Sequence, residues 1–209
     1  MQNRGQDRGL ELDADEADAI AELFNIGMGE SAAALSGMVG EEVLLSVPAL
    51  RVQHRSDIIN AIPPGEARRM CAVQEAFSGP FSGEAMLLFP EPEGMALVRR
   101  LIPGDATTPG DDEQDALTEI GNIILNGCLA SFSNLIASEV AGSVPGYRAG
   151  TAEQVIGHAE DPVLSVSIDV GLAAGDVSGQ VMFLLDIASR EAFGRAVQRL
   201  IAGAGGTAG

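Results

Sequence analysis

Residues 15–29 read DEADAIAELFNIGMG, and residues 112–126 read DEQDALTEIGNIILN. Both segments carry an aspartate, a glutamate and an asparagine at the same spacing, and a proline follows 23 residues after each asparagine. These residues are Asp18, Glu22, Asn25 and Pro48 in the first copy, and Asp115, Glu119, Asn122 and Pro145 in the second. The whole set is displaced by 97 residues. The repeat predicts two similar halves built around two copies of one site.

Each acid–acid–amide set is expected on one face of a helix. Positions i, i+4 and i+7 fall within an arc of roughly 60° and span about 10 Å of the helix axis. Ile20 and Leu23 point away from the polar set in the first copy, as Leu117 and Ile120 do in the second. Each helix should therefore bury its apolar face and present the polar ladder to solvent.

A solvated acidic face is a routine feature of helices, and one copy alone would indicate nothing more. Duplication explains why the residues were once identical, but not why exposed polar residues stayed identical, so the second copy favours a function. The ladder holds no nucleophile–base pair, and two carboxylates one turn apart would bind a cation only weakly. An amide on a rigid helix can orient a water for phosphoryl hydrolysis, and a nearby carboxylate can pair with a cation of a partner protein.

Charge limits the classes of partner. The 209 residues include 30 acidic and 12 basic residues, a net charge of -18, and every basic residue is Arg. A field of that sign repels nucleic acids and anionic membranes. Three explanations of the acidity stay open: a surface adapted to a very salty cytoplasm such as that of a halophilic archaeon, steering of a basic partner, and drift in a GC-rich genome.

Cysteine and histidine usage indicates no metal site. Cys71 and Cys128 are far apart and are expected to be two reduced, buried thiols of a cytoplasmic protein. His54 and His158 are isolated, so no metal and no cofactor of the chain's own is predicted. Residues 1–10 lack the apolar core of a signal peptide, and the apolar runs are too short for a membrane span.

The chain is expected to form one domain made of two repeats. The predicted order is a disordered N-terminus 1–12, a first half 13–101, a linker 102–110, a second half 111–203 and a flexible tail 204–209. Strands are expected at 42–47, 50–53, 70–77, 83–89, 163–170 and 177–185, and helices at 15–25, 31–40, 91–101, 111–138 and 187–201. Residues 54–69 are expected as a loop with a turn of helix. SGEAMLLFP at 82–90 resembles SGQVMFLLD at 178–186. The predicted fold is α+β, with pseudo-twofold halves sharing a mostly antiparallel sheet covered by long helices.

The doubled pattern [Asp/Ser]-x3-Glu-x2-Asn-x22-Pro resembles the signature of the CheC/FliY/CheX phosphatases of chemotaxis. NIGMGESAAALSGMVG in the first half, and LTEIGNI and ASFSNL in the second, are also similar to CheC. Two complete motifs and a length near 200 residues resemble the two-site CheC type, whereas CheX-like proteins carry one site and FliY-like proteins add a switch-binding domain. Phe24, where the second copy has Gly121, is one small departure.

The resemblance implies a substrate, a set of roles and partners. The substrate would be the phosphorylated response regulator CheY, and Asn25 and Asn122 would orient the attacking water. Glu22 and Glu119 would pair with the regulator's lysine, while Asp18, Asp115, Pro48 and Pro145 would support docking or geometry. Mg²⁺ would sit on the regulator. A second implied partner is the deamidase CheD.

Two other functions stay open at this point. A non-enzymatic adaptor would bind phosphorylated CheY or CheD without turnover. A structural component of the motor switch would need neither asparagine.

Overall fold

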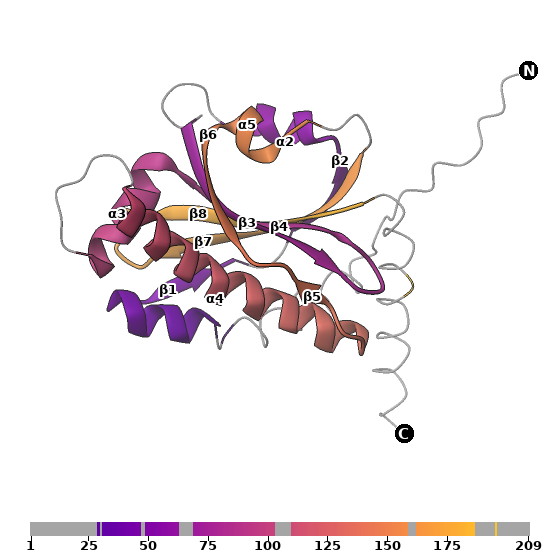
Figure 1. The fold of residues 1–209 in the computed structure, drawn as a ribbon, viewed down its shortest axis with the longest axis horizontal. Helices are drawn as coiled ribbons and strands as arrows, with labels where there is room; N and C mark the ends of the chain where they lie inside the picture. The colour runs from indigo at the N-terminus through magenta and orange to yellow at the C-terminus, as the bar shows by residue number, and fades with distance from the viewer. Residues whose placement is uncertain are drawn as a thin grey trace, which may run out of the picture.

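The computed structural model describes residues 29, 31–46, 49–62, 69–102, 110–158, 162–186 and 195. An eight-stranded, wholly antiparallel sheet forms the centre of this part of the chain (Figure 1). The strands are β1 (Val43–Leu45), β2 (Ala49–Gln53), β3 (Arg69–Ser78), β4 (Gly83–Pro90), β5 (Ala141–Gly142), β6 (Gly146–Thr151), β7 (Val163–Leu172) and β8 (Ser178–Leu185). Their order is β1-β7-β8-β4-β3-β5, with β2 also paired to β7 and β6 also paired to β3.

Helices cover both faces of this sheet. One face carries α3 (Glu91–Leu101), α4 (Asp111–Ile136) and the helical residues 31–39, over the larger apolar core (Figure 1). The short helices α2 (Arg55–Ala61) and α5 (Ala152–Ile156) lie on the other face over a smaller core. The sheet is thus the middle layer of the described residues, and α4 runs beneath it in Figure 1, with Asp115, Glu119 and Asn126 on its exposed side.

The sequence explains where the strands lie. In β7 the even-numbered residues from Leu164 to Leu172 are buried in the larger core, as the alternating pattern predicts for a strand. In β4 the run from Ala85 to Phe89 is buried without alternation, because this strand lies in the middle of the sheet with helices on both sides. Gly175 has φ +78° in the turn between β7 and β8, a conformation that glycine adopts without strain.

The predicted α+β class with a mostly antiparallel sheet is confirmed. The strands predicted at 70–77, 83–89, 163–170 and 177–185 and the helices at 91–101 and 111–138 match β3, β4, β7, β8, α3 and α4 within a few residues. The range 54–69 contains more helix than the predicted single turn, because α2 has seven residues and buries Ile58 and Ile59, while residues 63–68 lie outside the described part of the chain. Strand β6 and helix α5 had no counterpart in the predictions.

Some expectations lie outside the described residues. They are the helix at 15–25, most of the closing helix at 187–201, and the two ends of the predicted domain. The pair of buried thiols is confirmed: Cys71 and Cys128 are both free and buried.

Arg100 ties the end of α3 to two other parts of the fold. Its guanidinium contacts Asp176 at 2.7 Å, in the turn between β7 and β8, and Glu41 at 3.3 Å, just before β1. These partners raise the pKa of Arg100 above its usual value, with Asp176 the largest cause. The pairs are partly exposed, so each contributes only modestly to stability.

Candidate functional site

The second polar ladder stands on the free side of α4. Asp115 and Glu119 are exposed and Asn122 is half-buried, while Leu117 and Ile120 are buried against the sheet. The predicted division of this helix into a polar and an apolar face is therefore confirmed for the second copy. The first ladder, with Asp18, Glu22, Asn25 and Pro48, lies outside the described residues and stays a prediction.

Asn126 extends the ladder by one turn. Its side-chain Nδ2 donates a hydrogen bond of 2.6 Å to Oδ1 of Asn122. This bond fixes the plane of the Asn122 carboxamide and leaves its own N–H donors and the second lone pair of its oxygen for other partners. The first copy has Gly29 at the equivalent position, so comparison of the two copies did not reveal Asn126.

Two glycines set the position of α4. A Cβ on Gly121 would lie 2.4 Å from Cβ and Cγ1 of Val73 in β3. A Cβ on Gly127 would lie 1.6 Å from the Ser31 hydroxyl on the neighbouring helical segment. Close packing at these glycines holds the helix against its neighbours on both sides of Asn122.

Pro145 lies in a β-bulge beside α4. Strand β5 pairs Gly142 with Phe77 of β3, and strand β6 pairs Gly146 with Gln74. Three residues, 143–145, therefore oppose only two residues of β3, which is the one-residue excess of a bulge. A proline fits at this position because a residue in the bulge does not have to donate a backbone hydrogen bond to the neighbouring strand.

Ser143 fastens this bulge to β3. Its backbone N–H donates to the carbonyl of Ala76 at 2.8 Å, and its hydroxyl accepts from the N–H of Ala76 at 3.1 Å. The next two residues, Val144 and Pro145, then both lie opposite Glu75.

The opposite edge of the sheet has the same construction. Strand β1 pairs Leu45 with Val170 and strand β2 pairs Ala49 with Ser167, so the register against β7 shifts by one residue between the two strands. Ser46 exchanges the same two hydrogen bonds with Asp169, each of 2.9 Å. Ser-Val-Pro occurs at 46–48 and at 143–145. This shared tripeptide was a sequence signal of the bulges that the motif alone did not include.

The bulge and the ladder lie side by side. A Cβ on Gly142 would meet Leu129 of α4 at 2.9 Å, which places the start of the bulge at that level of the helix. Beyond the bulge, Tyr147 pairs with Val73, the residue on which Gly121 rests. Residues 143–146 therefore run beside the part of α4 that lies between residues 121 and 129, which includes Asn122. The segment that contains Pro145 therefore runs beside the helix that carries the second ladder.

Glu75 is a buried carboxylic acid beneath this edge. It is 3% exposed, and neither of its side-chain oxygens has a hydrogen-bond partner among the described residues. Burial raises the pKa of Glu75 to about 7. It lies against Gly142, and its charge contributes to a raised pKa of the Cys128 thiol, for which burial is the main cause. Glu75 belongs to the first half of the sequence but lies beneath the edge that carries the second motif, and sequence analysis did not single it out.

The buried thiols are not candidates for nucleophilic chemistry. Burial raises the pKa of Cys71 to about 12, so the thiolate is scarce at neutral pH. The described part of the chain brings no three His, Cys, Asp or Glu side chains together as a possible metal site. None of the helices in that part is both long and apolar enough to cross a membrane.

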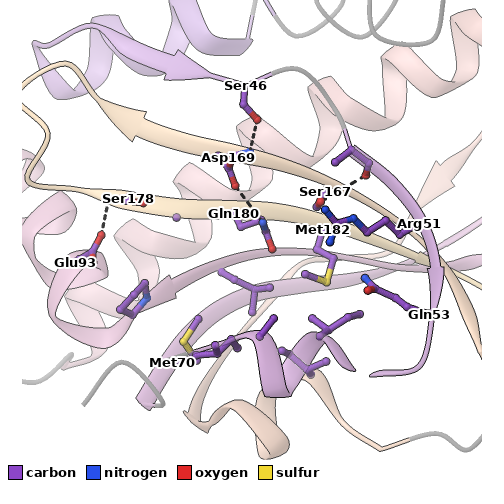
Figure 2. A pocket seen from close by; sticks show the side chains of 18 residues that line it. Ser46, Arg51, Gln53, Met70, Glu93, Ser167, Asp169, Ser178, Gln180 and Met182 are labelled. Carbon is purple, nitrogen blue, oxygen red and sulfur yellow. Dashed lines mark hydrogen bonds between the residues drawn. The ribbon is translucent and has the colours of Figure 1, made fainter. Parts of the chain in front are cut away.

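A cavity of about 470 Å³ opens on the other face of the sheet, away from α4 (Figure 2). Its apolar wall comes from α2, α5 and the sheet, and its polar rim includes Glu93, Asp169 and Gln180. Asp169 accepts from Nε2 of Gln180 at 3.1 Å, and Glu93 accepts from the backbone N–H of Ser178. These rim carboxylates are engaged within the fold, and none of the predicted site residues that the structure describes lines the cavity.

Comparison with known proteins gives named relatives, among them FliY and CheC, and no protein-family profile matches the chain. The flagellar motor switch phosphatase FliY of Bacillus subtilis (strain 168) is 26% identical over 168 residues, which cover 78% of this chain and 43% of FliY. The CheY-P phosphatase CheC of the same strain is 23% identical over 136 residues, which cover 63% of this chain and 65% of CheC. The chain thus spans less than two thirds of the length of either relative.

Comparison of the fold with solved structures also identifies FliY. The crystal structure of Thermotoga maritima FliY superposes with a TM-score of 0.71 at 15% identity, covering 91% of this chain and all of that one (100%). The long helix that carries the second Asp-Glu-Asn ladder covers an antiparallel sheet, and the proline of the motif lies in a bulge beside it. The chain with this arrangement is thus similar in sequence to FliY and CheC, and its fold resembles that of FliY, both members of the CheC/FliY/CheX superfamily.

Proposed function

We propose that this chain hydrolyses the phospho-aspartate of a CheY-type response regulator. The observation that carries the proposal is the complete second motif: Asp115, Glu119 and Asn122 on the free side of α4, with Pro145 in the bulge beside them. The names of the two relatives, a motor switch phosphatase and a CheY-P phosphatase, support the same activity.

Asn122 has the properties of a water-positioning group. Its amide is oriented by the hydrogen bond from Asn126, and α4 is packed closely on β3 at Gly121, so little freedom is lost when a water binds. The water oxygen forms a bond to phosphorus as the bond between phosphorus and the aspartyl oxygen breaks. The products are the aspartate carboxylate and inorganic phosphate, and the surplus proton passes to phosphate or solvent. Alignment supplies most of the catalysis in such a reaction.

Glu119 would hold the partner. Its exposed carboxylate, one turn before Asn122, is free to pair with a lysine beside the regulator's phosphorylation site. Asp115 would support that contact from the next turn. Mg²⁺, held by the regulator, would neutralise charge on the phosphoryl group, and the chain would supply the amide and the docking surface.

The first copy is proposed to act in the same way. Asn25 would orient the water, Glu22 would pair with the partner's lysine, and Asp18 and Pro48 would support docking or geometry. CheD is proposed as a second protein partner. Its contact residues are not assigned.

The test is hydrolysis of a purified, phosphorylated chemotaxis response regulator with Mg²⁺ present, at low and at multimolar salt. The wild-type chain should shorten the phosphoprotein's lifetime when present at substoichiometric concentration. Asn25→Ala with Asn122→Ala should abolish the effect and keep the wild-type circular dichroism spectrum and melting temperature.

The outcomes separate the rival functions. Acceleration that persists in the double variant would show that the assigned mechanism is wrong. Stoichiometric binding of the phosphorylated regulator without turnover would identify an adaptor. Binding to purified switch proteins, with no effect on the regulator, would indicate a structural role at the motor switch.

A further inference from the structure

Val144 is the most exposed large apolar side chain among the described residues, at 90% exposure. Single apolar residues on a protein surface are common, so exposure alone carries little weight. The next most exposed, Leu44, is 50% exposed. What distinguishes Val144 is the rigidity of its support and its position.

The support of Val144 is the Ser143–Pro145 bulge. The two hydrogen bonds between Ser143 and Ala76 fasten one side of it, and the fixed φ of Pro145 restrains the other. A β-branched side chain also has few rotamers. Val144 is therefore presented to solvent in a nearly fixed orientation, so little entropy is lost when a partner covers it.

Val144 lies on the segment that runs beside the part of α4 containing Asn122, the proposed water-positioning residue of the second copy. Residue 142 lies at the level of Leu129, and residue 147 pairs with the strand residue beneath Gly121. Val144 falls between these two levels, next to the turn of α4 that contains Asn122 and Asn126. A protein docked over that turn would reach the bulge as well (Figure 1).

We propose that Val144 is a docking contact for the phosphorylated response regulator and sets the affinity of the second site; this inference rests on the proposed function. The face of the regulator that fits is a cation beside an apolar patch. The cation meets Glu119, and the patch covers Val144. Salt screens the ionic contact but not the apolar one, so Val144 would maintain docking by a strongly acidic chain in concentrated salt.

The experiment uses the full chain carrying Asn25→Ala, so that only the second copy turns over. Val144→Asp in this background should raise KM for the phosphorylated regulator about tenfold or more, the expected loss for a buried valine, and leave kcat nearly unchanged. Val144→Ile should retain the parent KM. Binding of the regulator in its beryllofluoride-activated form, measured by fluorescence anisotropy, should weaken in the same proportion.

Val52→Asp is the matched control, because Val52 is exposed on β2 at the other edge of the sheet. The inference is overturned if Val144→Asp leaves KM and binding within twofold of the parent, or if Val52→Asp causes an equal loss. If the Asn25→Ala parent binds the regulator without turnover, the phosphatase proposal is refuted. The anisotropy comparison of Val144→Asp with this parent then still decides the role of Val144. A parent that neither binds nor hydrolyses refutes both.

Discussion

Glu75 and Ile168 occupy the same place in the two halves of the sheet. Each is the neighbour of a residue that exchanges two hydrogen bonds with a serine: Glu75 is next to Ala76, the partner of Ser143, and Ile168 is next to Asp169, the partner of Ser46. Glu75 pairs with Ala85 across the sheet, and Ile168 pairs with Val181. One half thus buries an acid where the other buries a hydrocarbon, so the second site has an ionisable group beneath its edge.

Glu75→Gln should stabilise the protein at high pH. The folded-state pKa of about 7 lies above the usual 4.5, so between these values the folded chain binds more protons than the unfolded one. Stability contributed by the protonated acid is therefore lost as pH rises from 4.5 to 7, at a cost on the order of 3 kcal/mol above pH 7. Urea unfolding at pH 5 and pH 8 should show that the variant has a larger free energy of unfolding than the wild type, mainly at pH 8.

The exposed Glu139 gives the control on the same edge. Glu139→Gln should change the unfolding free energy by less than about 0.5 kcal/mol at both pH values. An equal effect of Glu75→Gln at the two pH values would mean that Glu75 stays ionised, or stays protonated, across this range.

Gly121→Ala should destabilise the fold and impair the second site. The added methyl group meets the branched Val73 side chain at 2.4 Å, and neither the strand nor the helix can yield without shifting α4. Overpacking of this kind costs about 1–3 kcal/mol. Gly146→Ala, where nothing lies within 4 Å of the added atom, should be nearly neutral. Thermal melts and second-site kcat of the two variants check the difference.

Asn126→Ala should lower kcat of the second site about two- to tenfold with KM little changed. The variant removes the hydrogen bond that orients the Asn122 amide, and a neutral hydrogen bond is worth about 0.5–1.5 kcal/mol. The assay is best run in the Asn25→Ala background. An unchanged kcat would mean that Asn122 is oriented by the partner and not by Asn126.

Ser143→Ala should loosen the bulge. The N–H of Ala76 loses its acceptor, which should cost about 1 kcal/mol of unfolding free energy. KM of the second site should rise in parallel, because Val144 is less firmly placed. Ser143→Thr keeps the hydroxyl and should restore both values. Ser46→Ala should show the same loss of stability without the change in second-site KM, since Ser46 lies on the other edge.

The sequence predicted the elements that have strong local periodicity. The buried face of α4 followed from Leu117 and Ile120, and β7 followed from its alternation. Strand β6 lacked such a signal, because Gly146–Thr151 is an exposed edge strand whose partner, β3, lies about seventy residues earlier in the chain. The strand propensity of a segment does not indicate that it pairs with a strand so far away in the sequence.

The site was predicted in part for the same reason. Asp115, Glu119 and Asn122 lie on one helix, so their spacing was enough to place them together. The bulge that brings Pro145 alongside depends on register against a distant strand, and only the shared Ser-Val-Pro tripeptide signalled it. Glu75 could have been found, because period-two counting from Val73 to Phe77 places it on the buried face of β3.

The bulges also determine how the sheet ends. A regular edge strand offers a continuous row of free N–H and C=O groups on which another chain can build. At β5–β6 the extra residue breaks that row and Pro145 removes one donor, and at β1–β2 the same offset interrupts the opposite edge. Among the described residues, neither edge offers an uninterrupted row of groups for pairing with a second molecule. A segment that serves the site thus also protects an apolar-rich sheet against polymerisation.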